Sequence, residues 1–268
     1  MNEFLKANQA LWDDWTPIHA RSAFYDLAGF KAGKTSLKSI ELQELGDVAG
    51  KSLLHLQCHF GLDTLSWARR GARVTGVDFS GRAIDLARSL SRETGLEARF
   101  ICSDLYGLPD VLSDPFDIVF TSYGVLAWLA DLTAWSRIIG RFLRPGGTFY
   151  IVEDHPFAQV FDNTGEAEDL RIAYPYFHSP EPLMLEEHGS YAEPGADIHA
   201  VSYQWDHTLG EIVNSLIGAG LTIEFLHEFP YSSYAKVPFM EQDADGWWWL
   251  KVRRSAIPLT FSLKARRA

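Results

Sequence analysis

Two aspartates stand where the strands of a parallel sheet would present them to a nucleoside ligand. Asp78 ends the apolar segment 72–78, and Asp104 follows the segment 98–103. A carboxylate at the tip of such a strand can accept hydrogen bonds from both hydroxyls of a ribose. The carboxylate of Asp104 can accept one from the exocyclic amine of adenine while Leu105 packs against the ring. Either aspartate could instead only cap the turn that follows it, but together they predict a site for an adenosine-containing ligand.

The segment 52–57 predicts a buried strand whose following turn could bring free backbone N–H groups to the same ligand. The turn contains Cys58 and Gly61 and leads into a helix over 62–70. The first N–H groups of a helix have no partner inside it, so they suit a polar ligand. A single glycine is a weak signal, because it is also typical of a plain connection.

His55, Cys58 and His59 raise the question of a metal ion in this turn. Their spacing fits no standard zinc site, and no fourth ligand of the same kind stands nearby. We therefore predict no metal, with His55 as a satisfied residue of the core and Cys58 as a small apolar side chain.

Aromatic side chains follow the predicted strand 116–121. Ser122, Tyr123 and Trp128 leave its tip, and the two rings could form a wall that faces a cationic ligand. Tyr123 is for this reason a candidate catalytic residue and Trp128 a candidate substrate contact. Core packing is an equally good interpretation of Trp128.

The next predicted strand, 147–153, ends beside two ionisable residues. His155 belongs to the residue type that titrates near neutral pH, so it is the preferred general base, and Glu153 could orient it or bind a cationic acceptor. A structural role for His155 is equally open. Trp205 and His207 precede a predicted helix and could close the acceptor pocket, although His207 also suits a plain helix entry.

Strands and helices must alternate for these residues to meet at one edge of a sheet. The strand patterns lie at 52–57, 72–78, 98–103, 116–121 and 147–153, with helices at 62–70, 80–94 and 131–142. This alternation predicts a parallel sheet with helices on both faces. Thr208 and Glu211 form a capping box that begins another helix. Strands at 221–229 and 259–264 complete the pattern, and the last of them could run antiparallel.

Residues 52–153 resemble the core of class I S-adenosylmethionine-dependent methyltransferases. The resemblance is carried by the strand Phe-Asp-Ile-Val at 116–119, the turn Leu-Arg-Pro-Gly-Gly at 143–147, and the acidic strand tips Asp78 and Asp104. It implies a Rossmann-like fold with a seven-stranded, mostly parallel sheet. It also implies S-adenosylmethionine as cofactor, S-adenosylhomocysteine as product, and a small-molecule acceptor methylated on N, O or C. The residues expected to bind the cofactor are Gln57, Cys58, Gly61, Asp78, Phe79, Ser80, Asp104, Leu105, Ser122 and Tyr25.

The first motif departs from the family pattern. It resembles that of a bacterial subgroup with the sequence His-Leu-Gln-Cys-His-Phe-Gly, and His55 stands where an acidic residue is usual. Gln57 and His59 replace two glycines, and only Gly61 is kept. The side chains at 57 and 59 must therefore point away from the ligand or replace a contact. The methionine amine must find its anion elsewhere.

The chain divides by pattern into an N-terminal part and a methyltransferase domain. Residues 1–51 predict a helical lid, in which Tyr25 and several tryptophans could cover the cofactor or simply pack. Residues 52–268 form the predicted domain. Within it, 154–206 shows little periodicity and predicts an acceptor-side insertion, since long irregular loops in compact domains are usually functional.

Composition favours a metabolic enzyme of the cytoplasm. The formal net charge is −11, which disfavours nucleic acid as a partner, and two cysteines suit a reducing compartment. No apolar run is long enough to span a membrane. We expect a monomer or homodimer. Two alternatives stay open: a methyltransferase-like domain that binds without turnover, and a nicotinamide-dependent oxidoreductase, which would favour Gly-x-Gly-x-x-Gly where this chain reads Gln-Cys-His-Phe-Gly-Leu.

Overall fold

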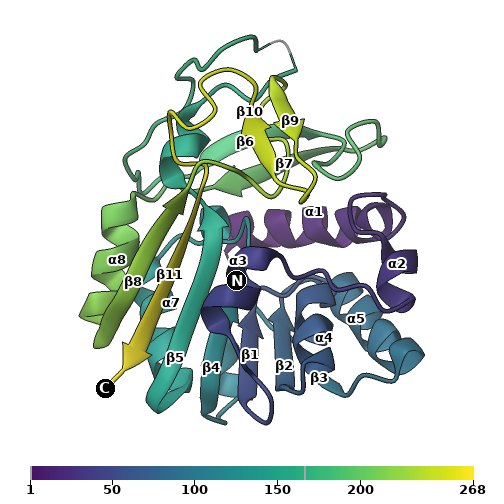
Figure 1. Ribbon diagram of the computed structural model, residues 1–268, viewed down its shortest axis with the longest axis vertical. Coiled ribbons are helices and arrows are strands. Elements are labelled where there is room, and N and C mark those ends of the chain that lie inside the picture. Colours follow the sequence, from purple (N-terminus) through teal and green to yellow (C-terminus); the bar gives the residue numbers. More distant parts are fainter. Residues whose placement is uncertain (1, 166) are drawn as a thin grey trace.

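A seven-stranded sheet forms the centre of the computed structural model, which describes residues 2–165 and 167–268 (Figure 1). Its strand order is β3-β2-β1-β4-β5-β11-β8. The strands are β1 (Ser52–Leu56), β2 (Arg73–Asp78), β3 (Ala98–Cys102), β4 (Phe116–Thr121), β5 (Leu143–Asp154), β8 (Leu221–Phe229) and β11 (Thr260–Arg267). β1 to β5 are parallel, and β11 runs antiparallel to both β5 and β8. The predicted fold class is therefore confirmed.

Helices cover both faces of this sheet, because its central strands are apolar on both sides. One face packs against α6 (Leu108–Val111), α7 (Leu132–Phe142) and α8 (Leu209–Gly218). The other packs against α3 (Ser39–Leu45), α4 (Leu62–Arg69) and α5 (Gly81–Thr94). The predicted caps begin these helices: Ser80 accepts a hydrogen bond from the N–H of Ala83, and Thr208 forms the capping box with Glu211.

The segment 154–206 is more regular than its sequence suggests. It contains the short helix η2 (Pro156–Val160) and an antiparallel hairpin of β6 (Leu183–His188) and β7 (His199–Gln204). A second hairpin, β9 (Met240–Gln242) with β10 (Trp248–Leu250), lies beside it beyond the carboxyl ends of the main strands (Figure 1). The expectation of an irregular insertion was wrong on this point, because short and only partly buried strands carry little apolar periodicity.

The N-terminal helix α1 (Glu3–His19) extends across the carboxyl ends of the main strands (Figure 1). Its buried Asn8 binds both backbone polar groups of Tyr203 on β7: its side-chain amide donates to the carbonyl at 2.7 Å, and its side-chain oxygen accepts from the N–H at 2.8 Å. α1 and the hairpin are thus joined above the sheet edge. After the helix α2 (Leu27–Lys31), the chain returns along the sheet to α3.

Two further sequence features receive a definite place. The basic residues Lys264 and Arg266 belong to β11 and pair with Glu224 of β8. Trp247 is buried in a core cluster together with residues of α3. Within the described residues, no helix is both long and apolar enough to cross a membrane.

Gly61 is a residue that the fold cannot easily replace, and this gives a first prediction. Its φ is +77°, and a Cβ there would lie 2.6 Å from the ring of buried Phe100. We expect Gly61→Ala to lower the free energy of unfolding by about 3 kcal/mol, from left-handed strain plus overpacking. Gly50 has a φ of +72° with nothing near its missing Cβ, so Gly50→Ala should cost only about 1–2 kcal/mol. If urea unfolding shows equal losses of stability for Gly61→Ala and Gly50→Ala, the ring of Phe100 moves aside without an energetic cost and the overpacking argument is wrong.

Candidate cofactor and acceptor site

The turn after β1 adopts the backbone of a glycine-rich loop although it contains one glycine. The φ angles of Gln57, His59 and Gly61 are +55°, +51° and +77°, all in the left-handed region. For a residue other than glycine this conformation costs about 1–2 kcal/mol, so it must be held by its surroundings. The N–H of His59 donates to Asp78 Oδ2 at 2.8 Å, which ties the turn to the tip of β2.

The two side chains that replace glycines make contacts of their own. The amide of Gln57 donates to the carbonyl of Val125 at 3.0 Å, which connects the β1 turn to the loop after β4. The ring of His59 packs against Trp12 of α1 and against Tyr25, with centroid distances of 5.2 and 5.4 Å. Glycines at these positions would let the backbone come close to a ligand. Gln57 and His59 instead contact neighbouring segments, and His59 connects the turn to the N-terminal helix α1.

A cavity of about 1000 Å³ opens over this turn and the tips of β1 to β5. Such a volume accommodates a nucleoside cofactor together with a small second ligand. The residues of the sequence-derived set that line it are Gln57, Cys58, Gly61, Asp78, Phe79, Asp104, Leu105, Ser122, Tyr123, Trp128 and Tyr25. The topology brings these residues to one edge because parallel strands end on the same side.

Asp78 is buried in the wall of this cavity. Besides the N–H of His59, its carboxylate accepts the N–H of Ser80 at 2.9 Å. Burial raises the pKa of Asp78 to about 6, and the two backbone donors oppose this rise. Asp104 also lines the cavity and accepts the N–H of Gly107 at 2.9 Å. Each carboxylate thus caps a turn and keeps lone pairs for a ligand, so the two interpretations of these residues are compatible.

Ser80 and His155 do not occupy the places expected of them. The hydroxyl of Ser80 donates to Asp13 of α1 at 2.6 Å and caps α5, and Ser80 is not among the residues that line the cavity. His155 is buried and lines neither this cavity nor the smaller one beside it. Its Nε2 contacts Glu228 at 2.9 Å, and its Nδ1 accepts the N–H of Phe157. Burial lowers its pKa despite Glu228. The ring caps η2, and both of its nitrogens have partners within the protein.

Tyr123 and Glu153 are committed to the scaffold through their polar atoms. The Tyr123 hydroxyl donates to Glu41 of α3 at 2.9 Å, so only its ring faces the cavity. The Glu153 carboxylate accepts the backbone N–H groups of Val125 at 2.7 Å and Leu126 at 3.1 Å. Burial and the neighbouring Asp154 raise the pKa of Glu153. Glu153 therefore shapes the loop after β4, which is a different task from the acceptor binding expected of it.

A second, smaller cavity of about 110 Å³ adjoins the first and shares part of its wall. Trp205, His207 and Glu153 line it. The backbone N–H of Trp205 donates to Ala127 at 2.9 Å, and Nε2 of His207 lies 2.7 Å from the carbonyl of Leu129. These bonds fasten the segment after β7 to the loop after β4.

The upper wall of the main cavity is aromatic. The indole N–H of Trp128 donates to the carbonyl of Gly124 at 2.9 Å, and its ring meets Trp12 edge-on at 5.3 Å. The hydroxyls of Tyr25 and Tyr191 are hydrogen-bonded to each other across the N-terminal segment and the insertion. Faces of such rings attract cationic ligands.

His55 is placed as the sequence suggested. It is buried, with Nδ1 2.8 Å from the hydroxyl of Thr64 and Nε2 3.3 Å from that of Ser122. Burial lowers its pKa to about 3, so the ring is neutral. Within residues 2–165 and 167–268, no cluster of three or more His, Cys, Asp or Glu side chains suited to a metal ion is found.

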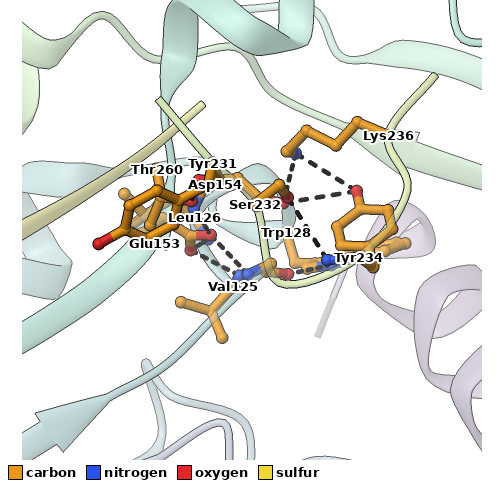
Figure 2. A network of polar contacts seen from close by, with 11 residues as sticks. Val125, Leu126, Trp128, Glu153, Asp154, Tyr231, Ser232, Tyr234, Lys236 and Thr260 are labelled. Atoms are coloured by element: carbon orange, nitrogen blue, oxygen red, sulfur yellow. Dashed lines mark hydrogen bonds and ion pairs between the residues drawn. The ribbon is translucent and has the colours of Figure 1, made fainter. Parts of the chain in front are cut away.

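Sequence reasoning missed a buried polar network at the tip of β5. Asp154 forms an ion pair with Lys236 at 2.7 Å, and the Lys236 ammonium donates to the Tyr234 hydroxyl at 3.3 Å (Figure 2). Asp154 and Tyr234 line the main cavity. Nothing in the sequence ties position 154 to position 236. Successive side chains of a strand point to opposite faces, so Glu153 and Asp154 at the end of β5 must face different surroundings. This alternation was the signal that could have drawn attention to Asp154.

Asp63, at the start of α4, is another cavity residue that sequence reasoning missed. The hydroxyl of Ser36 donates to its carboxylate at 2.5 Å, and burial raises its pKa. Asp63 and His55 both line the main cavity, so an acid is present in its wall although position 55 is a histidine. The position of Asp63 in the first turn of α4, directly after the loop that ends at Gly61, could have indicated from the sequence that it lies near the ligand.

Comparisons with known proteins agree with this architecture. Residues 53–147 match the model of a family described as a methyltransferase domain. The ubiquinone biosynthesis O-methyltransferase of Shewanella pealeana is 25% identical over 152 residues, which cover 57% of this chain and 61% of that protein. The one from Aeromonas salmonicida is 32% identical over 106 residues, or 40% of this chain and 44% of that protein. The chain thus spans less than two thirds of the length of these relatives.

A solved structure extends the likeness to most of the chain. The crystal structure of an S-adenosylmethionine-dependent methyltransferase from Mesorhizobium loti superposes with a TM-score of 0.57 at 22% identity, covering 93% of this chain and all of that one. Together with the strand order and the antiparallel β11, this defines the Rossmann-like fold of class I methyltransferases.

Proposed function

We propose that the protein transfers a methyl group from S-adenosylmethionine to a small-molecule acceptor. The observation that carries the proposal is the buried Asp78 carboxylate at the tip of β2, facing a cavity of about 1000 Å³ and tied to a turn with glycine-like backbone. Such a carboxylate suits the two hydroxyls of a ribose. The family match over 53–147 supports the same activity.

The residues present fit this cofactor. Asp78 would take the ribose hydroxyls, and Asp104 with Leu105 the adenine. Asp63 would take the methionine ammonium in place of the acid absent at His55. The side-chain oxygen of Gln57, buried without a partner among the described residues, is a further acceptor at the cavity. When bound, the cofactor supplies a methyl group already activated on a sulfonium.

The protein's own contribution to this reaction is positional. A transferable methyl needs an acceptor held in line with it and water kept away, so alignment and enclosure carry most of the rate. Trp128 and the insertion would form the walls that do this. Residues 1–51 would act as the lid, with α1 and Tyr25 closing over the cofactor, and 154–206 would form the acceptor side.

Several finer points belong to the same proposal. The first motif would mark a bacterial subgroup of small-molecule methyltransferases. The net charge of −11 favours a small acceptor over nucleic acid, and two cysteines suit a cytoplasmic enzyme, acting as a monomer or homodimer.

Calorimetry with S-adenosylmethionine, S-adenosylhomocysteine and NAD tests the proposal directly. Binding of the first two and not of NAD is expected. A methyl-transfer assay over a metabolite library then separates an enzyme from a domain that binds without turnover. A folded protein that binds NAD, or none of the three, would overturn the proposal.

Cofactor affinity should depend on pH through Asp78. Since burial raises its pKa to about 6, the carboxylate is ionised at pH 8 and becomes protonated as the pH falls through this value. A protonated carboxyl accepts hydrogen bonds less well, so the Kd for S-adenosylmethionine should rise below about pH 6. Calorimetry across this range should show the rise in the wild type and a flatter profile in Asp78→Asn. A flat wild-type profile would contradict the assigned contact.

A further inference from the structure

The end of β5 carries a carboxylate with one free oxygen. Asp154 is 5% exposed and lines both cavities. Its Oδ2 pairs with the Lys236 ammonium at 2.7 Å and lies 3.5 Å from the Tyr234 hydroxyl. Its Oδ1 is buried and has no hydrogen-bond partner among the described residues. A buried oxygen without a donor is costly, which indicates a ligand that brings a donor to it.

The surroundings of Asp154 fix its charge and its orientation. Burial alone would lower the pKa of Lys236, but Asp154 and Tyr234 outweigh this and raise it, so the ammonium stays charged at neutral pH. Figure 2 shows Lys236 and Tyr234 on one side of Asp154 and the Glu153 carboxylate, with its bonds to the loop after β4, on the other. The carboxylate is therefore held by one oxygen, while the other has no donor among the described residues.

The two cavities that Asp154 lines also have aromatic side chains in their walls. Tyr174, Tyr176 and Trp205 line the smaller cavity, and Tyr174 and Trp248 line the main one. Aromatic walls bind planar apolar ligands through stacked or edge-on contacts. These walls combine aromatic faces with polar side chains, among them the Asp154 carboxylate, so the site favours an aromatic ligand that carries a hydrogen-bond donor.

We propose that Asp154 accepts the proton of the methyl acceptor, and that the acceptor is an aromatic compound with a neutral O–H or N–H group. The inference rests on the methyl transfer proposed above. The acceptor heteroatom uses an electron pair to form a bond to the methyl carbon while the carbon–sulfur bond breaks and its electrons stay on sulfur. The O–H or N–H bond breaks, and its proton passes to Asp154 Oδ1. Lys236 is a positioning residue that holds the carboxylate.

Two catechols of different acidity test this role. Catechol is protonated in slightly alkaline buffer, whereas 4-nitrocatechol has already lost a proton there and needs no base. We expect Asp154→Asn to lower the single-turnover rate about 100-fold or more with catechol, and less than about 10-fold with 4-nitrocatechol. The Kd for S-adenosylmethionine should stay within about twofold. The matched variant Asp131→Asn, whose carboxylate accepts the N–H of Ala134 and which lines neither cavity, should change neither rate.

The possible results separate a failure of this inference from a failure of the proposed methyl transfer. Equal rate losses with the two catechols, in a folded variant, would give Asp154 a structural role and overturn the inference. A wild-type protein that binds S-adenosylmethionine but methylates no member of a panel of phenols, catechols and aryl amines would overturn the acceptor class. A protein that does not bind S-adenosylmethionine would instead contradict the proposed function itself.

Discussion

Replacing Asp78 with alanine should weaken S-adenosylmethionine binding by roughly 2–4 kcal/mol, which is about 30-fold to several hundredfold in Kd. The carboxylate would lose its bonds to the ribose hydroxyls. The N–H groups of His59 and Ser80 would also lose their acceptor, so the turn would be less well held. Calorimetry on the folded variant measures the loss.

A second aspartate separates ligand binding from capping. Asp131 caps α7 by accepting the N–H of Ala134 at 2.9 Å, and it lines neither cavity. Asp131→Ala should cost about 1 kcal/mol of stability and leave the affinity unchanged. If Asp78→Ala behaves in the same way, Asp78 is only a cap.

Replacing Lys236 with methionine should lower the free energy of unfolding by roughly 3–5 kcal/mol. Methionine fills a similar volume but leaves the buried Asp154 carboxylate without its cation. Because the folded pKa of Lys236 is raised above its usual 10.5, the contribution of this ammonium is fully present at neutral pH and is lost only as the pH rises past that raised value. Urea unfolding at neutral pH therefore measures it.

Two companions make this measurement specific. Lys31→Met breaks the ion pair with Glu93, in which both side chains are 45% exposed, and should cost less than about 1 kcal/mol. The double variant Lys236→Met with Asp154→Asn removes both charges and should recover most of the loss. A single variant as stable as the wild type would mean that water reaches Asp154 and replaces the lysine.

Much of the fold could be predicted because its signals are local. Strands β1 to β4 are short, largely apolar runs, and Ser80 and Thr208 cap α5 and α8 as expected. The hairpin of β6 and β7 could not be predicted, because its burial depends on α1 and the Asn8 contact with Tyr203, far away in the chain. The contacts of His155 could not be predicted for a related reason. The ring of His155 is drawn away by Glu228 of β8, which no pattern near position 155 reveals.

By itself the sequence determined the order of strands and helices and the acidic tips of β2 and β3, since side-chain periodicity and caps act over a few residues. The tertiary structure decided what those tips face. Only the folded chain holds Gln57 and His59 in a left-handed conformation, through contacts with Val125, Asp78 and Trp12. Only it joins Asp154 to Lys236, because antiparallel β11 and the segment after β8 bring distant parts of the chain to one edge. These contacts depend on the path of the whole chain. Segments far apart in the sequence are buried against one another, and no local pattern in either segment identifies its partner.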